Sequence, residues 1–271
     1  MNRKNQKAIP ITIACVAVAV TAWIAFCGYQ WSWGPFAKLH NMKTAGLPGN
    51  ADIYSPLNIP VLENSPLKGK NLVFLGSSVT YGSASRGISF ADYISARNGC
   101  IITKEAVSGT TLVDEGSASY ISRLKKLDTN MTVDLFVCQL STNDATQGKP
   151  LGTVSNSTNL TDFDIQTVAG AIEYIIAYAD VTWGCPVVFY TNPRYDSNEY
   201  AEMVTLLQKI ADKWNISIID MWNDNDFCAI TSEQNDLYMA DSIHPTPAGH
   251  PCGRESSWVC QGSTSPVLPA P

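Results

Sequence analysis

Hydrophobic and polar residues follow two alternating patterns between residues 70 and 221. Short apolar runs, which are typical of buried strands, alternate with longer stretches in which apolar residues recur at helical spacing. The predicted strands occupy residues 72–75, 100–106, 133–140, 185–192 and 216–221. Helices are predicted between them over residues 88–98, 118–127, 165–179 and 199–214. This alternation predicts an α/β fold of three layers, α/β/α, with a five-stranded parallel sheet.

A long polar segment, residues 145–162, interrupts this alternation and contains Gly148, Pro150 and Gly152. Loops of this length inside a compact domain are often functional. We expect this loop to overhang the edge of the sheet at which the strands end. A second polar connection follows the fifth predicted strand.

The amino-terminal region differs from the rest of the chain because residues 8–28 carry no charge. A helix of this length spans a hydrocarbon core of about 30 Å. Arg3, Lys4 and Lys7 precede it, which places the amino terminus in the cytoplasm and the domain outside. An uncleaved signal anchor and a cleaved secretory signal both fit this pattern. We favour the anchor because the apolar stretch is longer than a usual signal core and lacks a small-x-small cleavage site.

These patterns divide the chain into four parts. Residues 1–30 are the signal anchor or transmembrane segment, and residues 31–69 are an extracytoplasmic tether rich in Pro, Gly and Asn. Residues 70–250 form the α/β domain, and residues 251–271 are an irregular carboxyl-terminal tail without apolar periodicity. The expected location is the cell membrane, with a single pass and the domain outside, or the exterior if the anchor is cleaved.

Charge and cysteine content exclude several function classes. The chain has 24 acidic and 18 basic residues, a net charge of -6, and no basic stripe that could neutralise phosphates, so a nucleic-acid partner is not expected. The eight cysteines lack metal-ligand spacing. We expect neither a metal nor a cofactor.

Candidate chemistry begins where the first predicted strand ends, at Gly76, in a turn that contains Ser77, Ser78 and Thr80. The carboxyl ends of parallel strands are where ligands bind in such sheets. Such a turn by itself more often caps a helix. A nucleophilic serine also needs a base within hydrogen-bond reach, an orienting acid, and donors aimed at the developing oxyanion.

The rest of the chain contains a candidate for each of these roles. Histidine is scarce, and His244 has Asp241 three residues before it, so a short turn could hold the imidazole beside the carboxylate. Asn143 follows the third strand, and Gly109 follows the second, where the lack of a side chain lets a backbone N–H approach a substrate. Each could be an ordinary cap or turn residue. Together, each at the end of a strand or in the last loop and in the right chain order, they favour a catalytic site.

Four short blocks in this order resemble the SGNH hydrolase superfamily, also called the GDSL esterases and lipases. The blocks read GSSVT, SGTT, STND and DSIHP and extend over residues 76–245. The resemblance implies a flavodoxin-like fold with a five-stranded parallel sheet between helices. It also implies that Ser78 is the nucleophile, His244 the general base and then acid, and Asp241 its orienting carboxylate. The backbone N–H groups of Ser78 and Gly109, with the Asn143 side chain, would form the oxyanion hole.

The sequence departs from the family pattern in three places. Ser77 replaces the usual aspartate, and it is therefore a competing candidate nucleophile, while Val79 replaces leucine. Ser141 replaces the glycine that usually begins the third block. The family usually closes the domain with an amphipathic helix, but the apolar face for one is missing after Gly249. Part of the sheet is therefore expected to lack its cover, at a cost of about 25 cal/mol per Å² of wet apolar surface.

We therefore predict a membrane-anchored serine esterase that hydrolyses carboxylic esters through an acyl-enzyme on Ser78. Acetylated glycans, lipids and small acyl esters all remain candidate substrates. Two alternatives stay open: an acyltransferase that uses the same triad, and a catalytically silent surface module that binds glycan.

Overall fold

Five parallel strands form the centre of the domain, in the spatial order β2-β1-β3-β4-β5. The computed structural model describes residues 3–31 and 34–250 of the chain. The strands are β1 (Asn71–Gly76), β2 (Ile101–Ala106), β3 (Leu135–Gln139), β4 (Val187–Tyr190) and β5 (Ser217–Ile219). All four neighbouring pairs are parallel, which confirms the predicted five-stranded sheet.

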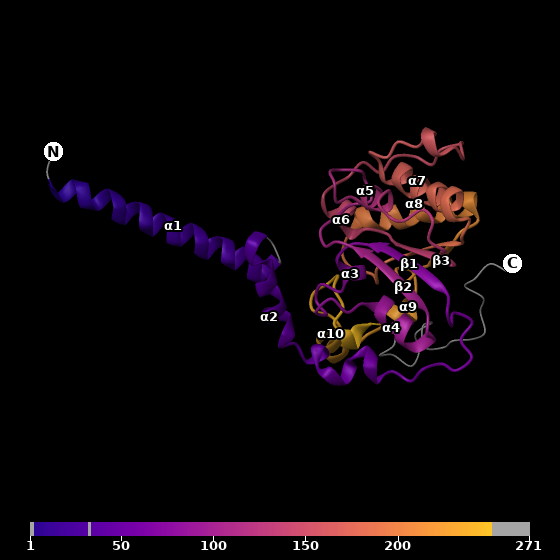
Figure 1. The fold of residues 1–271 in the computed structure, drawn as a ribbon, viewed down its shortest axis with the longest axis horizontal. Helices are drawn as coiled ribbons and strands as arrows, with labels where there is room; N and C mark the ends of the chain where they lie inside the picture. The colour runs from indigo at the N-terminus through magenta and orange to yellow at the C-terminus, as the bar shows by residue number, and fades with distance from the viewer. Residues whose placement is uncertain (1–2, 32–33, 251–271) are drawn as a thin grey trace.

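Helices cover the sheet on both sides, so the domain has the predicted three layers (Figure 1). One side carries α5 (Tyr120–Leu124), α7 (Val168–Trp183) and α8 (Asn198–Trp214). The other carries α4 (Phe90–Asn98), α9 (Asn225–Cys228) and α10 (Ser232–Tyr238). Two short helices, α3 (Ser78–Tyr81) and α6 (Thr142–Thr146), directly follow β1 and β3 at the carboxyl ends of these strands.

Alternate side chains of each strand enter two separate cores, as the two-residue period of a strand requires. In β1, Val73 and Leu75 join the core under α7 and α8, whereas Leu72 and Phe74 join the core under α4. A strand that is buried on both faces shows a continuous apolar run rather than an alternating one. This explains why β1 was recognisable in the sequence as a short apolar run.

The segment between β5 and the end of the domain contains two helices that periodicity did not predict, α9 and α10. Their apolar residues are too few for a recognisable stripe, but α10 has a clear start signal. The Thr231 side chain accepts from the Gln234 N–H, and the Gln234 side chain accepts from the Thr231 N–H. This reciprocal capping box stabilises a helix too short to be recognised by periodicity.

Only the start of the polar loop after α6 reaches the sheet edge of the serine turn, where Gln147 Nε2 donates to Gly109 O at 3.5 Å. The central part of the loop lies across α7 and α8 instead (Figure 1). Glu173 of α7 is fully buried and accepts from the Ser155 N–H at 2.8 Å. Lys213 of α8 donates to Ser155 O at 2.8 Å and also to Ser157 O and Glu173. The ion pair of Glu173 and Lys213 fixes the loop to the helical layer. Both residues are eighteen or more positions away from Ser155 in the sequence.

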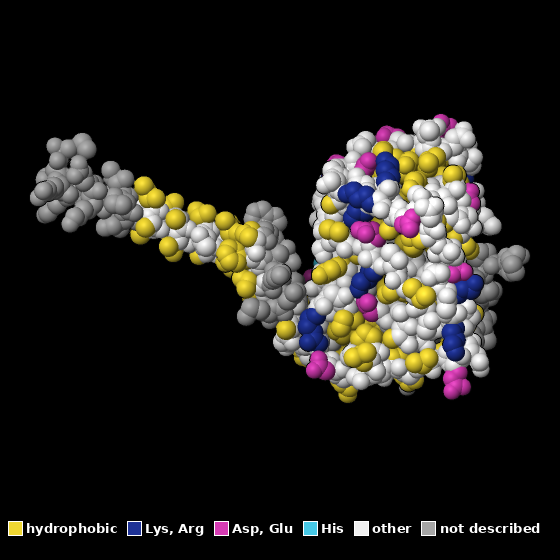
Figure 2. Space-filling model, viewed as in Figure 1, with side chains coloured by type: hydrophobic (Ala, Val, Ile, Leu, Met, Phe, Trp, Pro, Cys, Tyr) yellow, Lys and Arg dark blue, Asp and Glu magenta, His cyan; other side chains and the backbone are white. Residues whose placement is uncertain are grey.

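The amino-terminal helix α1 (Arg3–Trp31) projects away from the domain (Figure 1). Its segment Thr12–Tyr29 has a mean hydropathy of 1.9. The helix is therefore long and apolar enough to cross a membrane. Figure 2 shows hydrophobic side chains along the described part of its surface. After α1 come the 3-10 turn η1 (Gly34–Leu39), helix α2 (His40–Ala45) and three further 3-10 turns, Pro48–Asn50, Asp52–Tyr54 and Pro56–Asn58.

The segment assigned to the tether makes several contacts with the domain after residue 47. The Leu62 N–H donates to Arg97 O at 2.7 Å, and Ser65 Oγ donates to Asn98 Oδ1 at 2.7 Å. Tyr93 OH donates to Tyr54 O at 2.5 Å. Residues 47–69 therefore lie against the domain rather than extending from it.

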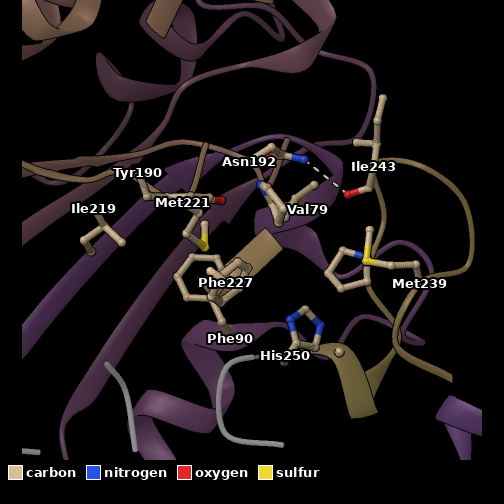
Figure 3. Close-up of a pocket in the computed structure, with 13 residues that line it drawn as sticks. Val79, Phe90, Tyr190, Asn192, Ile219, Met221, Phe227, Met239, Ile243 and His250 are labelled. Carbon is tan, nitrogen blue, oxygen red and sulfur yellow. Dashed lines mark hydrogen bonds between the residues drawn. The ribbon is translucent and has the colours of Figure 1, made fainter. Parts of the chain in front are cut away.

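A small, mostly apolar cavity of about 40 Å³ lies on the α4 side of the sheet, beneath β4 and β5 (Figure 3). Sheet residues Tyr190 and Ile219 line it, together with Phe90 from α4 and Phe227 from α9. His250, the last described residue, also lines it. The irregular tail itself, residues 251–271, lies outside the described residues.

Candidate active site

The serine turn is formed where β1 runs directly into α3. Gly76 is required by close packing, since a Cβ on this residue would lie 1.7 Å from Thr80 Oγ1. The backbone of Ser77 has φ −113° and ψ −138°, which lies outside the usual strand and helix regions. The chain therefore turns sharply at Ser77, and Ser78 becomes the first residue of α3.

This turn directs the two serine hydroxyls to different partners. Ser78 Oγ lies 2.8 Å from His244 Nε2. Ser77 is fully buried, and its hydroxyl donates to Gln139 Oε1 at 3.3 Å. The Ser77 N–H and the Thr80 hydroxyl donate to the same oxygen, at 2.9 and 2.8 Å. Gln139 Oε1 thus accepts hydrogen bonds from the polar groups beneath the turn. The Ser78 hydroxyl contacts the His244 imidazole instead.

His244 is held on its other side by Asp241. His244 Nδ1 lies 2.8 Å from Asp241 Oδ2, and the backbone N–H groups of Ile243 and His244 each donate to Asp241 Oδ1 at 2.8 Å. Burial alone raises the pKa of the Asp241 carboxyl, but the His244 ring and these N–H groups outweigh it and lower the pKa to about 2. An ionised Asp241 holds the ring proton on Nδ1, so that Nε2 can accept the Ser78 proton.

Three contacts position the loop that carries His244. The Ala240 N–H donates to His244 O at 2.9 Å. Two residues after β4, Asn192 Nδ2 donates to Ile243 O at 3.2 Å (Figure 3). Ser85 Oγ donates to Pro245 O at 2.6 Å. The loop is therefore fixed to the β4 end and to the segment after α3, which places the imidazole over the nucleophile.

The candidate oxyanion donors lie at the ends of β2 and β3. Gly109 has φ +80°, and a Cβ there would meet nothing within 4 Å, so conformation rather than space favours glycine. Asn143 Nδ2 donates to Thr110 O at 3.0 Å, which leaves its second amide hydrogen for a ligand. In the part of the chain that the structure describes, the backbone N–H groups of Ser78 and Gly109 donate to no protein acceptor.

Two buried charged residues that the sequence analysis did not assign to the site support this oxyanion loop. Asp144 accepts from the Leu112 N–H at 2.8 Å and from the Val113 N–H at 3.1 Å, and burial raises the pKa of its carboxyl. Arg123 donates to Gly76 O at 2.8 Å and to Thr110 Oγ1 at 3.1 Å. Arg123 therefore connects the strand before the nucleophile to the loop after Gly109.

A sequence signal exists for only one of the unpredicted supporting residues. Gln139 is a polar side chain inside an otherwise apolar run, and such a residue in a buried strand requires hydrogen-bond partners. Arg123 and Asp144 stand in polar surroundings in the sequence, where an exposed position is the usual outcome. Only their burial at 5% and 0% exposure, respectively, distinguishes them.

Comparison with known proteins agrees with this geometry. The model of the GDSL-like Lipase/Acylhydrolase family matches residues 74–251, which include the serine turn and the loop of His244. The chain belongs to this GDSL-like family. A search of curated proteins gives no match.

Solved structures similar to this GDSL-like chain share its fold at low sequence identity. A protein from Lactobacillus plantarum is 18% identical with a TM-score of 0.57, over 68% of this chain and 92% of its own. A protein of the G-D-S-L family from Desulfitobacterium hafniense is 16% identical with a TM-score of 0.53, over 74% and 100%. A GDSL-like protein from Bacteroides ovatus is 18% identical with a TM-score of 0.50, over 72% and 96%. These likenesses confirm the fold, and the family match supports a hydrolase.

Proposed function

We propose that this protein is a serine esterase that cleaves carboxylic esters through an acyl-enzyme on Ser78. The observation that carries the proposal is the continuous chain of contacts from Ser78 Oγ to His244 Nε2 and from His244 Nδ1 to Asp241, each 2.8 Å long. A serine hydroxyl is a weak nucleophile unless a base takes its proton, and this arrangement supplies that base.

The reaction proceeds in two steps. Ser78 Oγ attacks the ester carbonyl while its proton moves to His244 Nε2, and the oxyanion accepts hydrogen bonds from the Ser78 and Gly109 N–H groups and from Asn143 Nδ2. His244 then gives the proton to the departing alkoxide, so that the acyl–oxygen bond breaks and an alcohol leaves. Water resolves the acyl-enzyme by the same route and releases a carboxylic acid. Asp241 keeps its charge throughout and stabilises the imidazolium.

We further propose that α1 anchors the protein in a membrane with the domain outside. Thr12–Tyr29 supplies the span, and the basic residues before it support an amino terminus in the cytoplasm.

Hydrolysis of p-nitrophenyl acetate and butyrate by the full chain in detergent tests the catalytic proposal. Ser78→Ala is expected to lower kcat/KM by about 10⁴-fold or more, and Asp241→Asn by a similar factor, because both disable the nucleophile–base unit. Ser77→Ala is the matched control and is expected to retain activity within about tenfold. Activity retained in Ser78→Ala but lost in Ser77→Ala, with both variants folded, would reject Ser78 as the nucleophile.

Product analysis with added alcohols separates hydrolysis from acyl transfer. The esterase proposal predicts that free acid remains the main product at low alcohol concentration. A folded wild-type chain that neither hydrolyses the esters nor reacts with a serine-directed fluorophosphonate would instead favour a silent binding module.

A further inference from the structure

The chain enters the domain beside the catalytic loop. At Gly49 there is no room for a side chain, since a Cβ would lie 2.0 Å from Leu237 O and 2.2 Å from Thr246 Oγ1. Thr246 is two residues after His244 in the same loop. Gly49 therefore packs directly against the segment that holds the proposed catalytic imidazole.

The neighbouring residue, Asn50, is hydrogen-bonded to the segment after α3. Its side chain is 2% exposed, and Nδ2 donates to Ala84 O at 2.9 Å, shortly after α3. Arg86 Nη2 donates to Asn50 O at 2.7 Å. These contacts fix the entry point between the segment after the nucleophile helix and the loop of His244.

The connection from this entry point to the apolar span is short. It consists of residues 30–46, of which Gly34–Leu39 and His40–Ala45 are helical. At rises of about 2.0 and 1.5 Å per residue, these two elements together extend roughly 20 Å. The remaining residues add less than about 20 Å even when extended. This connection, residues 30–46, is called the leash below. It is no longer than the width of a domain of this size, roughly 40 Å.

The edge of the domain that carries the catalytic residues also lies on the side from which the leash and α1 depart (Figure 1). Helix α3, which begins with Ser78, and helix α6, which contains Asn143, are at this end of the sheet. Two large hydrophobic side chains are exposed beside the site, Tyr81 at the end of α3 (46%) and Val107 after β2 (40%). A tyrosine ring in this position suits the membrane–water interface, where Tyr and Trp side chains are enriched.

We propose that the leash holds the catalytic edge toward the membrane, so that the substrate is an ester of an amphiphile embedded in the same bilayer. This inference rests on the proposed esterase and on the anchoring of α1. The ester group of such an amphiphile lies at the interface, within reach of Ser78, and its chains remain in the bilayer. Restriction to a surface raises the effective concentration of enzyme and substrate, which makes a leash of this length useful.

The test uses the full chain reconstituted into phosphatidylcholine vesicles, with p-nitrophenyl palmitate in the bilayer and p-nitrophenyl acetate in solution. A flexible Gly/Ser segment of about 40 residues is inserted between Gly46 and Leu47, where Gly46 has nothing within 4 Å of its Cβ position. The insertion is expected to lower palmitate hydrolysis by about fivefold, because effective concentration falls with roughly the −3/2 power of leash length. Acetate hydrolysis is expected to stay unchanged, which verifies the fold and the chemistry.

A second readout measures orientation without catalysis. A fluorophore on Tyr81→Cys is expected to be quenched at least twofold more by headgroup-labelled quencher lipid than one on Val181→Cys. Val181 is the matched control because it is 76% exposed on α7, away from the catalytic edge. The fluorescence of the wild-type chain, which labels through its native cysteines, is subtracted from both measurements.

The outcomes separate the two proposals. Equal quenching at the two positions, or palmitate hydrolysis unaffected by the insertion, would overturn the membrane-facing orientation. Proteolytic removal of residues 1–46 in cells would overturn it as well, because the domain would then have no membrane anchor. Quenching at Tyr81→Cys without hydrolysis of either ester would support the orientation and reject the esterase.

Discussion

The two faces of the sheet are built differently. The face under α7 and α8 is packed by long helices with regular apolar periodicity, and its core includes fully buried residues such as Ile172, Ile175 and Leu207. The face under α4 has a smaller core and borders the apolar cavity (Figure 3). The proposed catalytic residues lie at the edge between them. The difference indicates that the α7/α8 face supplies most of the stability, and that the α4 face tolerates change.

The largest contrast is expected between buried ion pairs on the two faces. On the α7/α8 face, Lys213→Met leaves the fully buried Glu173 carboxylate without its cation. We expect a loss of about 3–5 kcal/mol in the free energy of unfolding. Urea unfolding followed by circular dichroism measures it, and the double variant Glu173→Gln/Lys213→Met is expected to recover a large part.

The matched pair on the α4 face is Lys104 and Asp92, 2.6 Å apart. Lys104→Met is expected to cost only about 1 kcal/mol, because Asp92 is 31% exposed and still accepts from the Ser89 N–H at 2.7 Å. Similar losses in the two single variants would contradict the proposed asymmetry.

Truncation of apolar side chains is the next most sensitive comparison. Leu207→Ala, at a fully buried position of α8, is expected to cost about 2–5 kcal/mol because a cavity forms in a packed core. Met221→Ala, on the wall of the existing cavity, is expected to cost about 1 kcal/mol. Thermal and urea unfolding of both variants measure this difference, and an equal cost would show that the cavity wall is packed as tightly as the core.

The α4 face also carries a titratable group that makes stability depend on pH. Burial lowers the pKa of His250 to about 4, below its ordinary value of about 6.5. As pH falls through 6.5 the unfolded chain takes up this proton before the folded chain does, so stability decreases until about pH 4. The expected loss reaches about 3 kcal/mol.

His250→Gln removes this titration, so its free energy of unfolding is expected to change less than that of the wild type between pH 6.5 and 4. Urea unfolding at both pH values measures the difference. Parallel pH profiles for the two proteins would show that His250 takes up its proton equally in the folded and unfolded chains.

The smallest effect is expected from filling the cavity. Ile219→Phe enlarges a side chain that lines it and is expected to change the free energy of unfolding by less than about 1 kcal/mol, in either direction. Ile175→Phe makes the same change in the packed core and is expected to cost about 1–3 kcal/mol. Differential scanning fluorimetry of the two variants ranks them, and the opposite order would refute the assignment of the tolerant face.

The sequence by itself determined the alternation of strands and helices and the order of the functional blocks. Apolar runs and helical periodicity are local properties, so β1 and α7 were predictable without knowledge of their neighbours. The chain order also placed Ser78, Gly109 and Asn143 at one end of the domain, since parallel strands end at the same edge.

Tertiary structure alone decided which of the adjacent serines meets the imidazole and what holds the site together. The direction of a side chain at a strand end depends on a backbone turn and on distant partners, here Gln139 for Ser77 and His244 for Ser78. The docking of Gly49 against Thr246 and the contacts of Arg123 join segments far apart in the sequence. Such contacts leave no periodic trace, because burial of a polar group depends on partners that folding brings together.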